Sequence, residues 1–134
     1  MTIGSDLIVE VPVIKKKILV VEDEQSLLKL QSILLTLRGY NVEGVMDGQA
    51  ALEAVVTTNP DLILLDIMLP KIDGLEVCRQ VKANETTRHI PVIMLTAKKS
   101  MEDRFMGKQA GADMYITKPY KSSMVIETIQ RFLS

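Results

Sequence analysis

Short apolar runs alternate five times with longer segments of helical periodicity along the chain. The apolar runs predict five strands, at residues 17–21, 41–45, 61–65, 91–95 and 114–117. Three of these runs contain the stretches ILVV, LILL and VIML, which are typical of strands that are covered on both faces. The alternation predicts an α/β fold built on a parallel sheet.

The segments between and after the apolar runs predict five helices. In the first helix, leucines recur at helical spacing, and Gly39 stands where a left-handed residue would end it. These leucines are Leu27, Leu30, Leu34 and Leu37. The other helices are expected at residues 49–56, from Asp73 and Gly74 through Val81, at 101–110 and at 122–133. No repeat or flexible linker divides the chain, so we expect one domain at residues 17–134.

Residues 1–16 precede the first predicted strand and are interpreted as an N-terminal tail. The functional interpretation of the tail is an added strand or a docking arm, and the alternative is a frayed terminus or a cloning remnant. The observation behind the first interpretation is a set of aliphatic residues: Leu7, Ile8, Val9, Val11 and Val13.

Composition excludes several classes of function. The chain has 134 residues, of which 47% are hydrophobic and 25% are charged, so it can bury the core of one domain. Its 16 basic and 17 acidic residues give a formal net charge of −1, and it has no tryptophan. We therefore expect no direct binding of nucleic acid, which needs a positive surface or stacking aromatic rings.

The chain also lacks the signals of membrane insertion and secretion. No apolar run approaches the roughly 20 residues that cross a bilayer, and Asp6, Glu10 and Pro12 interrupt the N-terminal segment. The single cysteine, Cys78, cannot form an intrachain disulfide and is expected to pack inside the protein. These features favour a cytoplasmic protein that does not contact the membrane.

Polar residues follow directly after four of the five predicted strands, where open parallel sheets bind their ligands. They are Glu22 and Asp23, Asp66, Thr96, and Lys118; the apolar residues Ala97 and Pro119 come directly after Thr96 and Lys118. Three carboxylates in one cleft repel one another by about several kcal/mol per pair unless a cation lies among them. Oxygen ligands without a second cysteine or histidine favour Mg²⁺ or Mn²⁺.

Because Mg²⁺ leaves coordination positions for phosphate oxygens, a metal-held phosphoryl group is the expected second ligand. Lys118 would supply a positive charge to that group and Thr96 a hydroxyl donor. Asp66 follows a fully apolar strand and is the candidate nucleophile, with Glu22 and Asp23 as metal ligands.

Four stretches of the chain carry a resemblance to a known family. They are ILVVEDE (18–24), PDLILLDIMLPKIDG (60–74), IPVIMLTA (90–97) and AGADMYITKP (110–119). These stretches resemble the response-regulator receiver domains of bacterial two-component signalling, over residues 17–133. The resemblance implies a doubly wound, flavodoxin-like (βα)5 fold with a five-stranded parallel sheet in the order 2-1-3-4-5.

The resemblance also implies a function and its partners. The chain would accept a phosphoryl group from a phosphohistidine of a sensor histidine kinase or a histidine phosphotransfer protein. It would act as a phosphoacceptor module rather than as a turnover enzyme. Its signal would pass through the face of the fourth helix, fifth strand and fifth helix to a downstream protein target or an output domain.

Each predicted site residue takes a role from this resemblance. It implies that Asp66 is the phosphoacceptor and that the main-chain carbonyl of Met68 joins Glu22, Asp23 and Asp66 as a Mg²⁺ or Mn²⁺ ligand. Ala97 and Lys118 would bind the phosphoryl group, Thr96 would be the switch hydroxyl, and Tyr115 would be the aromatic residue whose rotamer follows Thr96. The bond between Lys118 and Pro119 is expected to be cis.

The chain departs from the family at two informative positions. Met68 stands two places after the acceptor, where many members have a polar residue that helps to orient the hydrolytic water. A thioether cannot hold a water by hydrogen bonding in this way, so we expect slow self-dephosphorylation. Met114 replaces an acidic residue that a set of DNA-binding relatives uses in a dimer, so that dimer is not assumed.

Four methionines lie in the last third of the chain and are interpreted either as core filling or as an adaptable contact surface. They are Met101, Met106, Met114 and Met124. The only histidine, His89, precedes the fourth strand and is expected at the edge of the sheet opposite Asp66, so the phosphodonor must be another protein.

Two other classes remain as alternatives. A haloacid-dehalogenase-type phosphatase also uses an aspartate after a strand but needs a second aspartate two places on, where Met68 stands. A flavodoxin-like module for flavin mononucleotide would need a phosphate-cradling loop after the first strand, and the sequence EDEQS there repels phosphate unless a metal is bound.

Overall fold

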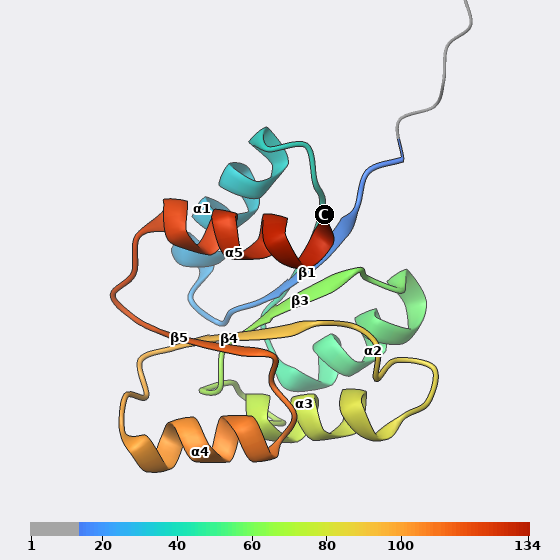
Figure 1. Ribbon diagram of the computed structural model, residues 1–134. Helices are drawn as coiled ribbons and strands as arrows, with labels where there is room; N and C mark the ends of the chain where they lie inside the picture. Colours follow the sequence, from blue (N-terminus) through green and yellow to red (C-terminus); the bar gives the residue numbers. More distant parts are fainter. Residues whose placement is uncertain (1–13) are drawn as a thin grey trace, which may run out of the picture.

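The computed structural model describes residues 14–134 (Figure 1). The elements follow in the order β1 (Lys17–Val21), α1 (Gln25–Leu37), β2 (Asn41–Val45), α2 (Gly48–Thr58), β3 (Leu62–Leu65), α3 (Gly74–Ala83), β4 (Val92–Thr96), α4 (Met101–Gln109), β5 (Met114–Thr117) and α5 (Ser122–Leu133). Residues 1–13 of the expected tail lie outside the described residues, so the interpretation of that segment stays a prediction.

The five strands form one parallel sheet in the order β2-β1-β3-β4-β5, which confirms the predicted fold class and strand order. Helices α1 and α5 cover one face of this sheet, and α2, α3 and α4 cover the other (Figure 1). Helices on both faces let the central strands β3 and β4 be buried along their whole length.

Each face of the sheet has its own hydrophobic core. On the face of α2 and α3, alternate strand residues such as Leu19, Ile63 and Met94 pack against the helices. On the face of α1 and α5, the intervening residues, among them Val20 and Ile93, pack against the other two helices. The alternation follows from the two-residue period of a strand, and it holds the carboxyl ends of the strands rigidly together.

Four predicted elements, at residues 17–21, 41–45, 114–117 and 122–133, have the observed bounds, and the other predicted bounds differ by one or two residues, for identifiable reasons. Strand β4 begins at Val92 rather than at residue 91, because Pro91 has no N–H to donate to the sheet. It ends at Thr96, which pairs with Thr117 of β5. Helix α2 begins earlier than expected because Asp47 caps it, accepting the N–H of Ala50 at 2.7 Å.

The leucine pattern of α1 was only a partial guide to its buried face. Leu30 and Leu37 are 50% and 76% exposed, whereas Leu35 and the polar Gln31 are buried. Gln31 can lie inside because its side-chain amide donates a 2.7 Å hydrogen bond to the hydroxyl of Tyr120. Leucines on several sides of this helix allow more than one apolar stripe, and packing against α5 selects the one through Leu35.

The structure places Cys78 and His89 where the sequence predicts them, inside the protein and before β4. Cys78 is fully buried on α3 and is a free thiol. His89 is exposed in the segment before β4, at the opposite end of the sheet from Asp66. Across residues 14–134, no helix combines the length and apolarity that crossing a bilayer requires.

Candidate functional site

The carboxyl ends of β1 and β3 place two carboxylates side by side. Glu22 follows β1 and Asp66 follows β3, which are neighbours in the sheet. The main-chain N–H of Glu22 donates to the carbonyl of Val45 at 3.1 Å, and that of Asp66 donates to the carbonyl of Val21 at 3.2 Å. The hydrogen-bond ladder thus continues past the strands and fixes the backbone of both acidic residues.

Asp23 completes an acidic cluster with these two residues. One carboxylate oxygen from each of Glu22, Asp23 and Asp66 lies within 4.8 Å of the other two. Glu22 and Asp66 are only 3% and 6% exposed, while Asp23 is exposed to solvent. Two carboxylates of the cluster are therefore buried and one is open to solvent, and we call this cluster the acidic pocket.

Lys118, which follows β5, supplies the positive charge of the pocket. Its Nζ donates to Oε1 of Glu22 at 2.8 Å and to Oδ2 of Asp66 at 3.0 Å. Its main-chain N–H donates to the carbonyl of Thr96 at 2.8 Å, which ties the lysine to the end of β4. The bond between Lys118 and Pro119 is cis, as the resemblance implies.

Each buried carboxylate also accepts a hydrogen bond from the backbone with its second oxygen. Oε2 of Glu22 accepts the N–H of Glu24 at 3.1 Å, and Oδ1 of Asp66 accepts the N–H of Met68 at 3.1 Å. Both carboxylates are thus held in place by one ammonium and one main-chain amide, which orients them before any ligand arrives.

Burial and charge act in opposite directions on the ionisable groups. Burial raises the pKa of Glu22 above its ordinary value, and the hydrogen bond from Lys118 only partly offsets this effect. Burial also disfavours the charged form of Lys118, but its hydrogen bonds to Glu22 and Asp66 outweigh burial and raise the pKa of the ammonium. Lys118 therefore stays protonated at neutral pH.

Three carboxylates against one ammonium leave an excess of negative charge in the pocket. The donor atoms are all oxygens, with no cysteine or histidine in the cluster. Such a set fits a hard divalent cation such as Mg²⁺ or Mn²⁺. The Met68 side chain is 55% exposed beside this pocket, and the role of its carbonyl as a ligand stays a prediction.

The two predicted switch residues are connected through the backbone of Lys98. Thr96 is completely buried at the end of β4, and its Oγ1 accepts the N–H of Lys98 at 3.4 Å. The hydroxyl of the half-buried Tyr115 donates to the carbonyl of Lys98 at 2.7 Å. Burial raises the pKa of this hydroxyl, so it remains a donor. Ala97 lies exposed in the same β4–α4 loop.

The structure therefore brings Glu22, Asp23, Asp66 and Lys118 into direct proximity and joins Thr96 to Tyr115 indirectly. The part played by Lys98 was not predicted, since a main-chain group leaves no signature in the sequence. Gly74 was predicted only as a residue at the beginning of the third helix. A methyl carbon added there would overlap the main-chain carbonyl of Asp66, so Gly74 allows α3 to start directly against the end of β3.

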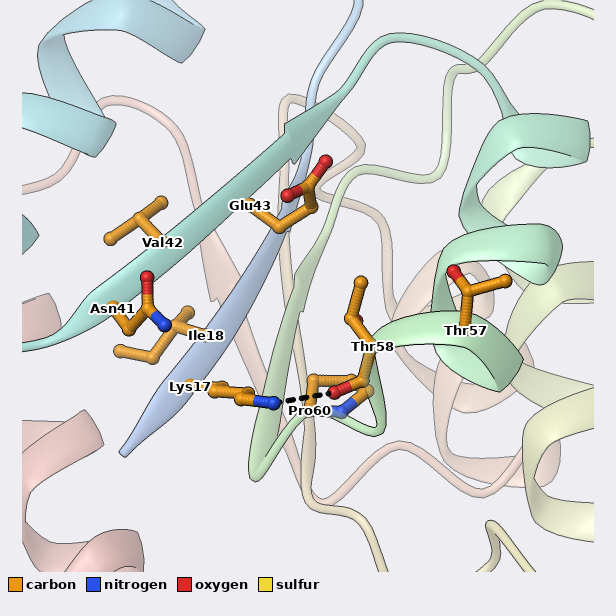
Figure 2. Close-up of a pocket in the computed structure, with 8 residues that line it drawn as sticks. All are labelled: Lys17, Ile18, Asn41, Val42, Glu43, Thr57, Thr58 and Pro60. Atoms are coloured by element: carbon orange, nitrogen blue, oxygen red, sulfur yellow. Dashed lines mark hydrogen bonds between the residues drawn. The ribbon is translucent and has the colours of Figure 1, made fainter. Parts of the chain in front are cut away.

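A second hollow lies away from the acidic pocket. Figure 2 shows it between the first residues of β1 and β2 and the end of α2, with Nζ of Lys17 donating to the carbonyl of Thr58 at 3.3 Å. Its lining consists of Lys17, Ile18, Asn41, Val42, Glu43, Thr57, Thr58 and Pro60. Because it lies where the strands begin, it contains none of the predicted site residues.

Comparisons with known proteins agree with this geometry. The family model described as "Response regulator receiver domain" matches residues 18–130. The alkaline phosphatase synthesis transcriptional regulatory protein PhoP of Bacillus subtilis is 44% identical over 118 residues, which cover 88% of this chain and 48% of that protein. The response regulator ArlR of Staphylococcus saprophyticus is 44% identical over 117 residues, or 87% of this chain and 52% of ArlR.

Solved structures give the same result. The BeF3-activated DrrB receiver domain superposes with a TM-score of 0.82 at 34% identity, covering 90% of this chain and 98% of that one. The chemotaxis response regulator CheY4 of Vibrio cholerae superposes with a TM-score of 0.83 at 31% identity, covering 89% and 99%. The chain spans about half the length of the two curated relatives named above.

Proposed function

Because the chain belongs to the response regulator receiver family, we propose that residues 17–134 form a phosphoacceptor switch whose acceptor is Asp66. The observation that carries the proposal is the contact between Lys118 and both Asp66 and Glu22, next to the exposed Asp23. This arrangement places one nucleophilic carboxylate, one fixed ammonium and an acidic cation site within a single pocket.

The proposed reaction transfers a phosphoryl group from a phosphohistidine of a partner protein. A carboxylate oxygen of Asp66 attacks phosphorus and forms a P–O bond, while the P–N bond of a phosphohistidine that is protonated on its other ring nitrogen breaks and its electron pair stays on the ring, which leaves a neutral imidazole on the partner. Lys118 balances negative charge that gathers on the phosphoryl oxygens. The main-chain N–H of Met68 donates to Oδ1 of Asp66, and this hydrogen bond keeps Oδ1 from acting as the attacking atom.

A divalent ion fits the acidic pocket, and Glu22, Asp23, Asp66 and the carbonyl of Met68 are the residues proposed to hold it. When bound, it would neutralise charge between the carboxylates and the phosphoryl oxygens. The proposed partners are a sensor histidine kinase or a histidine phosphotransfer protein, and a downstream target or output domain. A cytoplasmic location is proposed, because such partners present their phosphohistidines there.

Phosphorylation would change the outer face of the domain through the β4–α4 loop. The new group adds about −1.5 to −2 charges and three acceptor oxygens beside Thr96. Movement of the Thr96 hydroxyl toward one of these oxygens would release its bond to Lys98, whose carbonyl also holds Tyr115. The face of α4, β5 and α5 would then repack and change its affinity for a partner.

The proposal is tested by incubating the protein with acetyl phosphate and Mg²⁺ and measuring its intact mass. We expect one added phosphoryl group on the wild type and none on Asp66→Asn. Asp61→Asn is the matched control, since Asp61 lies at the other end of β3, where its carboxylate accepts the main-chain N–H of Lys17. Phosphorylation of Asp66→Asn, or repeated turnover of phosphate esters as in a phosphatase, would contradict the proposal.

A further inference from the structure

The loop between β3 and α3, residues 67–73, connects the proposed phosphoacceptor to the next helix. Its first end is fixed by the sheet, because Asp66 donates its N–H to the carbonyl of Val21. Its second end is fixed by Gly74, which donates to the carbonyl of Ile67 at 2.8 Å. Between these ends lies Met68, whose amide holds Asp66 and whose carbonyl is the proposed metal ligand.

The first residue of α2 contacts the backbone of this loop closely. Gly48, the first residue of α2, is buried and donates its N–H to the carbonyl of Pro70 at 3.2 Å. A methyl carbon added to Gly48 would overlap the main-chain oxygen of Ile72 and lie 2.6 Å from its carbonyl carbon. Only glycine allows the helix and the loop backbone to approach so closely.

The loop needs such support to keep its shape. Lys71 has a φ of 69°, a left-handed conformation that a side chain other than glycine adopts at a cost. Nζ of Lys71 lies 3.6 Å from Oδ2 of Asp47, the residue that caps α2. Both partners of this ion pair are partly exposed, so the backbone contact at Gly48 is the stronger constraint.

We propose that Gly48 is a positioning residue for the phosphoryl site, acting through residues 67–72 on the affinity of the pocket for Mg²⁺. The inference rests on the proposed function. If a side chain at position 48 forces the two backbones apart, the loop moves rather than α2, because Ala51, Ala54 and Val55 anchor that helix in the core. With both ends of the loop fixed, the displacement falls on Met68 and its neighbours.

The test compares Gly48→Ala with the wild type by titrating Mn²⁺ under electron paramagnetic resonance and Mg²⁺ by calorimetry. We expect Gly48→Ala to weaken metal affinity by about tenfold or more, the effect typical of residues that support metal ligands. Phosphorylation by acetyl phosphate should slow at low Mg²⁺ and return to the wild-type rate at saturating Mg²⁺. The difference between the rates at low and at saturating Mg²⁺ separates a positioning role from a general loss of structure, because added metal would not restore the rate of a misfolded protein.

Two further variants serve as controls. Gly44→Ala adds the same methyl group to β2, where the nearest atom is the flexible end of the Leu28 side chain at 3.0 Å, and should leave metal affinity unchanged. Should Gly48→Ala fail to fold, Asp47→Ala removes the cap and ion pair that hold α2 to the loop, and should weaken affinity by about twofold or more.

Unchanged metal affinity in a folded Gly48→Ala protein, or in Asp47→Ala where that variant replaces it, would overturn the inference. So would a phosphorylation rate that stays low at saturating Mg²⁺, since the substitution would then disturb Asp66 itself. Failure of the wild type to bind metal or to be phosphorylated at Asp66 would overturn the proposed function as well. Experiments on the wild type alone detect that failure, so it is distinguishable from an effect of a variant at position 48.

Discussion

The ammonium of Lys118 lies 3.0 Å from the carboxylate of Asp66, although 52 positions separate the two residues in the sequence. The same ammonium lies 2.8 Å from Glu22, and both carboxylates are almost wholly buried. Lys118 therefore neutralises two acidic groups that the sheet brings together at its edge. We therefore expect removal of this lysine to affect the folded protein even when no ligand is bound.

The first prediction concerns the stability of a Lys118→Met variant. Without the ammonium, two buried carboxylates lose their counter-charge, and we expect the free energy of unfolding to fall by about 3 kcal/mol in metal-free buffer. Mg²⁺ should restore part of the loss, so it should raise the melting temperature of Lys118→Met more than that of the wild type. Urea unfolding with and without Mg²⁺ measures both effects.

Lys99→Met is the control for this experiment, because Lys99 is exposed in the β4–α4 loop and makes no ion pair among residues 14–134. Its stability should match the wild type. Equal stability of Lys118→Met and wild-type protein without metal would show that the ion pairs contribute nothing to the fold.

The second prediction is that Asp23→Asn raises the stability of the metal-free protein and weakens its binding of Mg²⁺. Asp23 adds a third negative charge to the pocket but forms neither a hydrogen bond nor an ion pair through its side chain within the described structure. Its neutralisation should raise the metal-free free energy of unfolding by about 0.5 kcal/mol, a small value because the group is exposed. Thermal melts should also show that Mg²⁺ no longer stabilises this variant; a full Mg²⁺ response would exclude Asp23 as a ligand.

The fold was predictable because its signals are local. Unbroken apolar runs mark β1, β3 and β4, and capping residues such as Asp73 mark where a helix begins. The buried face of α1 was less predictable, because that helix carries leucines on several sides. The orientation of α1 follows from its packing against α5 and includes the contact of Gln31 with Tyr120 of a distant segment, and no pattern within α1 reports these contacts.

The candidate site was predictable for a topological reason. Parallel strands end at one edge, so charged residues after β1, β3 and β5 must meet there, and Lys118 indeed contacts Glu22 and Asp66. The supporting backbone contacts were not predictable. The approach of Gly48 to Ile72 depends on how α2 packs against a loop that lies beyond β3 in the sequence.

The third prediction concerns the lifetime of the phosphorylated form. The side chain of Met68 is exposed beside the pocket and cannot hold a water by hydrogen bonding. Met68→Asn introduces a carboxamide while keeping the main-chain N–H that binds Asp66. We expect phosphate release to accelerate about tenfold, less than the roughly 100-fold or more of an acid–base group, because a carboxamide orients a water but does not take its proton. Release is followed after rapid removal of acetyl phosphate; Met68→Leu should decay like the wild type, and an equally slow Met68→Asn would contradict the idea.

The fourth prediction uses the contact between α4 and Tyr115. Gly107 is the one buried residue of α4, and a methyl carbon on it would lie 2.7 Å from the Tyr115 ring. Gly107→Ala should displace the ring, break the hydrogen bond from Tyr115 to Lys98, and lower the free energy of unfolding by about 1 to 3 kcal/mol. Tyr115→Phe keeps the ring and loses only the hydroxyl.

The two variants differ in what nuclear magnetic resonance should report. Gly107→Ala should shift the ring signals of Tyr115 and the amides of the β4–α4 loop, whereas Tyr115→Phe should affect chiefly the amides near Lys98. Unchanged Tyr115 ring signals in Gly107→Ala would show that α4 moves away and the ring keeps its place.

The fifth prediction is a pH dependence that arises from Cys78. This thiol is fully buried, it donates to the carbonyl of Ala110 at 3.3 Å, and burial raises its pKa from an ordinary 9.0 to about 11. The unfolded chain therefore loses the thiol proton at lower pH than the folded protein does. The contribution of Cys78 to stability is complete below about pH 9 and disappears as the pH rises toward 11, a loss of about 2 to 3 kcal/mol.

Tyrosines and lysines also titrate in this range, so the informative quantity is the difference between wild type and Cys78→Ala, from urea unfolding at about pH 8 and about pH 10.5. The wild type should lose more stability across that interval than the variant, even though the alanine leaves a small cavity that lowers the stability of the variant at both pH values. Equal losses in the two proteins would mean that the Cys78 thiol ionises as easily in the folded protein as in the unfolded chain.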